Sequence, residues 1–168
     1  CYHAVKGVLG QDAGYVWHQE SSLEGYDCLI LPGGFSYGDY LRPGAMARFS
    51  PAMDALRRFV DNGGTAIGIC NGFQILCESG LLPGALLPNE QLEVRGQWVN
   101  LRAERNDTLF SAACSPGQVL RVPVSHGEGN YFANQATLEE LEREGRVLFR
   151  YCDDTGEATP EANPNGSA

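Results

Sequence analysis

A cysteine placed between two glycines constrains the fold of this chain more than any other feature. The run G-I-C-N-G at 68–72 follows a short apolar segment and precedes a helical pattern of apolar residues. This order is the strand–turn–helix pattern of a nucleophile elbow, G-x-S-x-G, with cysteine in the place of serine. The glycines permit a sharp turn, and the N-terminus of the following helix favours a thiolate. The pattern therefore predicts that Cys70 is a nucleophile at the end of a strand.

Composition narrows the class of protein. The chain has 168 residues, a net charge of −9 and six cysteines. Its length suits a single domain, 1–168, with a sizeable core, and its acidity argues against binding to phosphate backbones. No apolar run in the sequence approaches the about 20 residues that a membrane-spanning helix needs. The cysteines lack zinc spacing and are too sparse for a disulfide scaffold, so we expect a cytoplasmic protein. Because of its acidity and its short apolar runs, we expect it to bind neither nucleic acid nor membrane.

Strand and helix signals alternate along the sequence. Apolar and alternating runs predict strands at 14–18, 27–31, 65–69, 97–101, 119–124 and 147–151. Helical spacing predicts helices at 2–9, from Pro51 to Gly63, from Asn71 to about Gly80, and after a capping box at 137–140. The run at 27–31 is typical of a strand buried on both faces of a parallel sheet. The order predicts an α/β fold with three layers and a mainly parallel sheet, of the flavodoxin-like kind.

A thiolate at an elbow suits acyl transfer, which requires hydrogen-bond donors for the developing oxyanion. The backbone N–H of Asn71 is one such donor by the geometry of an elbow. The glycine-rich loop at 32–44 leaves a strand at the sheet edge where doubly wound folds place their sites, so its segment 33–35 is the best candidate for the second. Gln74 lies one helical turn after Cys70, where its amide could pair with an amide substrate. An ordinary solvated side chain is the alternative for Gln74.

Four motifs together resemble those of the class I (triad-type) glutamine amidotransferases. They are L-P-G-G-F-S-Y-G-D-Y at 31–40, G-I-C-N-G-F-Q-I-L at 68–76, L-L-P-G-A-L-L at 81–87 and V-S-H-G-E-G at 124–129. The glycine-rich loop combined with C-N-G-F-Q and H-G-E-G most resembles the glutaminase subunits of purine biosynthesis. The resemblance implies that Cys70 is the nucleophile and that Gly34 and Asn71 offer oxyanion-hole amides. It also implies that Gln74 helps to hold the substrate glutamine.

The same resemblance implies a reaction and its partners. Glutamine is hydrolysed to glutamate and ammonia through a thioester on Cys70. The ammonia passes to a separate ATP-dependent synthase subunit, with any small accessory subunit, that converts formylglycinamide ribonucleotide to the corresponding amidine. We expect neither a metal nor an organic cofactor in this chain, because ATP and magnesium would belong to the synthase subunit.

The general base that the resemblance implies is not found in this sequence. The family's catalytic His and Glu form a His-Pro-Glu motif after a later strand, and this sequence contains no such motif. The family's first strand is also absent, so we expect a fragment, inactive alone, whose catalytic His and Glu lie outside this chain. His126 and Glu128 imitate a catalytic pair, since a cysteine nucleophile needs a base. The resemblance places them in a loop near the active site, and we favour a structural or interface role for His126.

Two other functions stay open from the sequence. One is a cysteine hydrolase of the wider elbow superfamily, although such enzymes usually place a histidine directly after the nucleophile, where this chain has Asn71. The other is a non-catalytic module that docks on a synthase, which would suit the missing His and Glu. Such a module would need neither the elbow nor the glycine-rich loop.

Overall fold

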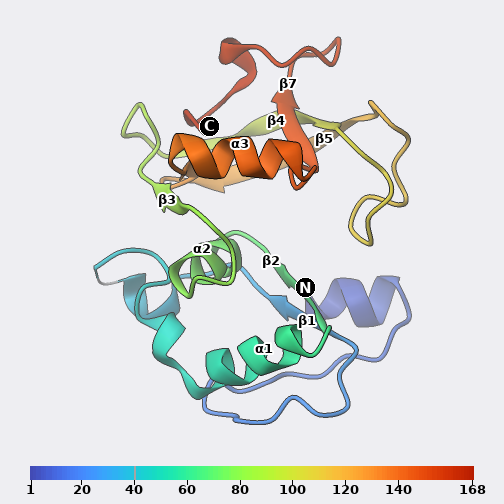
Figure 1. Ribbon diagram of the computed structural model, residues 1–168, viewed down its shortest axis with the longest axis vertical. Coiled ribbons are helices and arrows are strands. Elements are labelled where there is room, and N and C mark those ends of the chain that lie inside the picture. The colour runs from blue at the N-terminus through green and yellow to red at the C-terminus, as the bar shows by residue number, and fades with distance from the viewer. Residues whose placement is uncertain (40) are drawn as a thin grey trace. The chain divides into compact units, whose positions relative to one another are not determined.

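The structure is a computed structural model that describes residues 1–39 and 41–168. The chain divides into two compact units, Cys1–Pro83 (unit 1) and Gly84–Ala168 (unit 2), each with sheets of its own (Figure 1). Within the described ranges, no helix is long and apolar enough to cross a membrane. The grouping of both units into one domain stays a prediction.

Unit 1 is built around two parallel strands. Strand β1 (Cys28–Leu31) pairs with β2 (Thr65–Gly68) along their whole length. Parallel neighbours require a crossover connection, which here contains helix α1 (Pro51–Asp61). Helix α2 (Asn71–Glu78) follows β2 after a two-residue turn. Because Leu31 pairs with Gly68, the loop that leaves β1 and the turn that leaves β2 begin at the same edge of the sheet.

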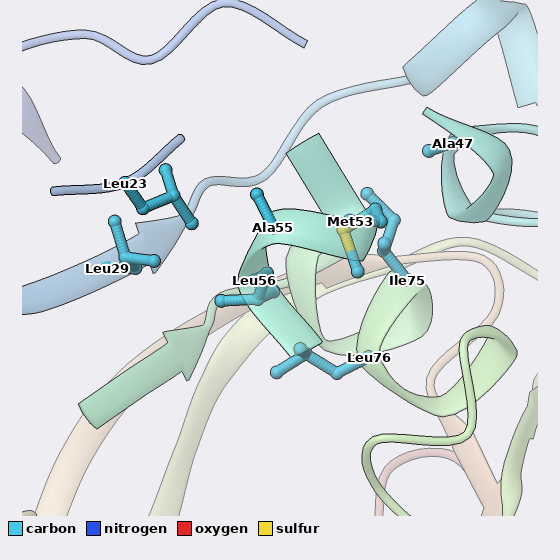
Figure 2. Close-up of a cluster of buried hydrophobic side chains, with 8 residues drawn as sticks. All are labelled: Leu23, Leu29, Ala47, Met53, Ala55, Leu56, Ile75 and Leu76. Carbon is cyan, nitrogen blue, oxygen red and sulfur yellow. The ribbon is translucent and has the colours of Figure 1, made fainter. Parts of the chain in front are cut away.

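The core of unit 1 holds both helices against β1. Its members are the apolar side chains drawn in Figure 2, namely Leu23, Leu29, Ala47, Met53, Ala55, Leu56, Ile75 and Leu76. Leu29 comes from β1, Leu56 from α1, and Ile75 and Leu76 from α2. Each buried side chain of this size contributes about 1.5–3 kcal/mol relative to exposure. The packing therefore fixes the helix that begins directly after the candidate nucleophile.

Unit 2 contains two antiparallel sheets and one helix. Strand β3 (Ala85–Leu87) pairs with β6 (Asn130–Phe132). The second sheet has the order β5-β4-β7, made of β4 (Arg95–Ala103), β5 (Val119–His126) and β7 (Phe149–Cys152). Helix α3 spans Gln135–Arg143. Exposed and half-buried residues alternate along β5, which is the pattern of a strand with one covered face.

Four shorter helical turns complete the described secondary structure. They are the π-turn η1 (Ala4–Val8) and the 3-10 turns η2 (Ser36–Asp39), η3 (Ala47–Phe49) and η4 (Pro160–Ala162).

The predicted α/β class is confirmed, and so is the strand–turn–helix element around Cys70. Fewer strands pair in parallel than the sequence predicted. Among the described strands, only β1 and β2 run parallel. The connections within unit 2 place their strands side by side as antiparallel neighbours, which need no crossover helix.

Three local expectations were wrong. Residues 14–18 form no strand, because they pair with none of the described strands and end in a turn at Trp17. β1 is not buried on both faces, since Leu29 is buried but Cys28 is exposed. Helix α3 begins earlier than the capping box predicted, because the side chain of Asn134 accepts the backbone N–H of Thr137.

Candidate active site

Cys70 occupies the turn between β2 and α2 in a conformation that side chains rarely adopt. Its φ of 54° and ψ of −115° lie in a sparsely populated region, which costs about 1–3 kcal/mol for a residue with a Cβ. The backbone N–H of Phe73 donates to the carbonyl of Cys70 at 2.9 Å and begins the helix. The thiol is exposed. A strained backbone that presents an exposed thiol is the geometry that the elbow motif predicts.

Cys77 provides a contrast with Cys70. It is buried within α2. Burial raises the pKa of its thiol to about 11, with a smaller contribution from the neighbouring Glu78. Cys77 is therefore protonated and unreactive at neutral pH, and the exposed Cys70 is the candidate nucleophile.

The glycine-rich loop passes directly beside Cys70. A methyl group on Gly33 would lie 3.1 Å from Cβ and 3.6 Å from Sγ of Cys70. Gly34 has a φ of 146°, a conformation that suits glycine and turns the chain after the end of β1. The structure thus brings the predicted segment and the nucleophile together within unit 1. The assignment of the Gly34 and Asn71 amides to an oxyanion hole stays a prediction. Tyr40, the last residue of the loop motif, lies outside the described residues.

The side chain of Asn71 also belongs to the site, a role that its position in the sequence did not predict. The residue is only 3% exposed. Its Oδ1 accepts the hydroxyl of Ser36 and, at 3.3 Å, the backbone N–H of Ser36. Its Nδ2 donates to Oε1 of Gln74 at 3.0 Å. Gln74 is therefore a half-buried member of a hydrogen-bonded group rather than a solvated side chain. The one sequence signal for this role of Asn71 was a polar residue at the first position of an apolar helix.

His126 ends strand β5 in unit 2, in a group of asparagines. Nδ2 of Asn89 donates to the carbonyls of Glu93 and His126, at 2.7 and 2.9 Å. Oδ1 of Asn89 consequently faces Nδ1 of His126 and the N–H of Gly129, both at 3.0 Å. An amide oxygen only accepts, so Nδ1 carries the proton of the neutral ring. Nε2 is then the acceptor, and Nδ2 of Asn165 lies 3.4 Å from it.

This environment disfavours protonation of His126. Desolvation by burial lowers the pKa of the imidazole below its usual value. Protonation would place a second N–H at Nε2, facing the amide nitrogen of Asn165. Both effects favour the neutral ring. Glu128 lies half-buried in the following turn. The structural role expected for His126 agrees with these contacts, and the near-site role of both residues stays a prediction.

A pH dependence of stability follows from the lowered pKa of His126. The unfolded chain binds a proton at a higher pH than the folded chain does, so the free energy of unfolding falls as the pH drops from about 7 to about 5. His126→Gln should remove this component, because glutamine does not titrate. Urea unfolding at both pH values measures the effect, with His3→Gln as the control. An equal pH dependence in wild type and His126→Gln would contradict the assignment.

The α/β fold with Cys70 at a strand–turn–helix elbow is that of an enzyme with a cysteine nucleophile. Sequence comparison identifies the family. Residues 8–168 match the CobB/CobQ-like glutamine amidotransferase domain. The chain belongs to this family, so the predicted glutamine amidotransferase is confirmed.

Similar proteins include curated subunits of one enzyme. The chain is 57% identical over 166 residues to phosphoribosylformylglycinamidine synthase subunit PurQ of Moorella thermoacetica, covering 99% of this chain and 70% of the relative. It is 54% identical over 171 residues to the same subunit of Koribacter versatilis, covering 99% and 74%. The structure of PurLQS from Thermotoga maritima matches 98% of this chain and 69% of that chain, with a TM-score of 0.82 and 38% identity.

Proposed function

We propose that this chain is the glutaminase subunit of a phosphoribosylformylglycinamidine synthase. The exposed Cys70 at a strained elbow, with the glycine-rich loop beside its sulfur, carries the proposal. Membership of the glutamine amidotransferase family and identities of 54–57% to PurQ subunits support it. An elbow cysteine followed by Asn71 rather than histidine favours this activity over other cysteine hydrolases of the superfamily.

The reaction begins with attack of the Cys70 thiolate on the side-chain amide carbon of glutamine. The carbonyl oxygen becomes an oxyanion, for which the backbone N–H groups of Gly34 and Asn71 are the proposed donors. The carbon–nitrogen bond then breaks, and the nitrogen takes up a proton and leaves as ammonia. Water hydrolyses the thioester to glutamate and restores the thiol. We assign no proton transfer to His126, because Asn89 and Asn165 contact its two ring nitrogens.

The ammonia is proposed to pass to an ATP-dependent synthase subunit that converts formylglycinamide ribonucleotide to the amidine. The relatives named above are subunits of that synthase, which supports a partner of this kind. ATP and magnesium belong to the partner in this proposal, and the glutaminase step uses only side chains and backbone amides. All six cysteines are free thiols, which suits the reducing conditions of a cytoplasm.

Selective labelling tests the glutaminase proposal. A diazo-ketone analogue of glutamine should alkylate Cys70, and excess glutamine should protect it. Mass spectrometry of the whole chain provides two internal controls, the exposed Cys28 and the buried Cys77. We expect labelling of Cys70 to exceed that of either control by about a hundredfold, because only Cys70 lies where a bound glutamine analogue is held for attack. Equal labelling of Cys70 and Cys28, or no protection by glutamine, would contradict the proposal.

A further inference from the structure

The side chain of Asn71 joins three parts of unit 1. It lies at the first position of α2, directly after the nucleophile. It reaches Ser36, 35 residues earlier in the glycine-rich loop, and Gln74, one turn later in the helix. With an exposed fraction of 3%, its carboxamide has little access to water. Buried polar groups are costly unless they are bonded, so this carboxamide is held firmly by its partners.

The direction of each hydrogen bond in this group follows from one backbone atom. The N–H of Ser36 only donates, so the atom of Asn71 that faces it is the carboxamide oxygen. The amide nitrogen of Asn71 must then face Gln74, and it can only donate. The atom of Gln74 that receives this bond is consequently its oxygen. The other atom of the Gln74 carboxamide is therefore its amide nitrogen, which is a donor.

We propose that the Asn71 side chain is a positioning residue for the glutaminase reaction, acting through Ser36 on the Gly34 amide and through Gln74 on substrate binding. The inference rests on the proposed function. Ser36 lies two residues after Gly34, so a bond from the elbow to Ser36 sets how closely the Gly34 amide approaches the carbonyl that Cys70 attacks. Loss of one oxyanion donor costs about a hundredfold to a thousandfold in rate, and a misplacement of about 1 Å costs about a hundredfold.

The glycine-rich loop has a strained backbone after Ser36. Tyr37 and Leu41 have φ values of 55° and 82°, which are unusual for residues with side chains. Both side chains are exposed, Leu41 to 88%, so burial of these two side chains does not hold the loop. Ser36 is bonded to the elbow, whereas the hydroxyl of Tyr37 is bonded to Nδ1 of His18 at 2.7 Å. These two neighbouring hydroxyls therefore provide a matched pair for mutation.

The loop half of the inference is tested with three variants. Ser36→Ala should slow the maximal rate of Cys70 labelling by the diazo-ketone about tenfold, because the Gly34 amide is less well placed. Ser36→Thr should restore most of this rate, since it keeps the hydroxyl. Tyr37→Phe loses a loop hydroxyl of the same kind and should label at the wild-type rate. Iodoacetamide, which needs no oxyanion hole, should label Cys70 equally in all of these chains.

The Gln74 half is tested with Asn71→Asp. This variant keeps an oxygen for Ser36 but has no donor for Gln74. We expect the half-saturating concentration of the diazo-ketone to rise about tenfold, because Gln74 loses the bond that directs its amide. Ser36→Ala should instead change the maximal rate with little change in that concentration. This separation would not arise from a general loss of stability, which thermal unfolding of each variant measures.

Failure of the inference can be told from failure of the proposed function. In the assembled synthase, a wild-type subunit that the diazo-ketone does not label at Cys70 overturns both. A labelled wild type whose rate and half-saturating concentration are unchanged in Ser36→Ala and Asn71→Asp overturns the inference alone. An equal slowing of iodoacetamide labelling also overturns it, because the effect would then concern the exposure of the thiol.

Discussion

Cys70→Ser is expected to lower glutamine-dependent synthesis by at least about a thousandfold in the assembled synthase, because a serine hydroxyl is a far weaker nucleophile. Synthesis supported by added ammonium should be unchanged, since it bypasses the thioester. Glutamate release and formation of the amidine product measure the two activities separately. Equal loss of both would indicate that the variant disrupts the assembly rather than the nucleophile. Full retention of glutamine-dependent synthesis would contradict the role of Cys70.

The strained backbone of Cys70 adds a stability test to this activity test. Cys70→Gly and Cys70→Ala should both be inactive, but the glycine variant should be more stable than the alanine variant. Glycine relieves about 1–3 kcal/mol of strain and loses about 0.5–1 kcal/mol to chain entropy, so we expect a net difference of about 1 kcal/mol. Urea unfolding of both variants gives this difference. A more stable alanine variant would show that the positive φ of 54° stores no strain.

The elbow could be predicted from the sequence because the residues that determine it are local. Two glycines flank the cysteine, apolar residues precede it and a helical pattern follows, all within 65–78. The same reasoning could not supply the bond between Ser36 and Asn71, which are 35 positions apart. Either residue alone is typical of a turn or a helix start. Only the parallel pairing of β1 with β2 brings their two loops to one edge of the sheet.

The end of the chain shows the same limit in unit 2. Residues 153–168 are polar and rich in turn formers, so the sequence gives no sign of packing. Yet Asn165 is fully buried, with its Oδ1 accepting the backbone N–H and hydroxyl of Ser167 at 3.0 and 2.7 Å. Its backbone carbonyl accepts the N–H of Glu90 at 3.0 Å. Hydrogen bonds of buried polar residues therefore help to fix this segment, and hydrophobic periodicity does not detect them.

The close approach of α2 to β1 makes Gly72 the glycine with the largest expected effect on stability. A methyl group at this position would overlap the carbonyl oxygen of Leu31. That oxygen cannot easily turn away, because it accepts the N–H of Ile69 at 2.9 Å. In an open helix, alanine would be more favourable than glycine by about 1 kcal/mol. Here the overlap with backbone atoms decides the sign, and we expect Gly72→Ala to destabilise the chain by about 3 kcal/mol.

Urea unfolding of Gly72→Ala measures this cost, and Gly7→Ala is the matched control. Gly7 lies in η1, where a methyl group would meet nothing within 4 Å, so its replacement should be neutral or slightly stabilising. The Gly72 variant should also lose diazo-ketone labelling of Cys70, because a helix pushed away from β1 carries the Asn71 amide with it. Unchanged unfolding in Gly72→Ala would mean that the elbow does not depend on this close approach. Reduced labelling with unchanged stability would instead place the whole effect at the Asn71 amide.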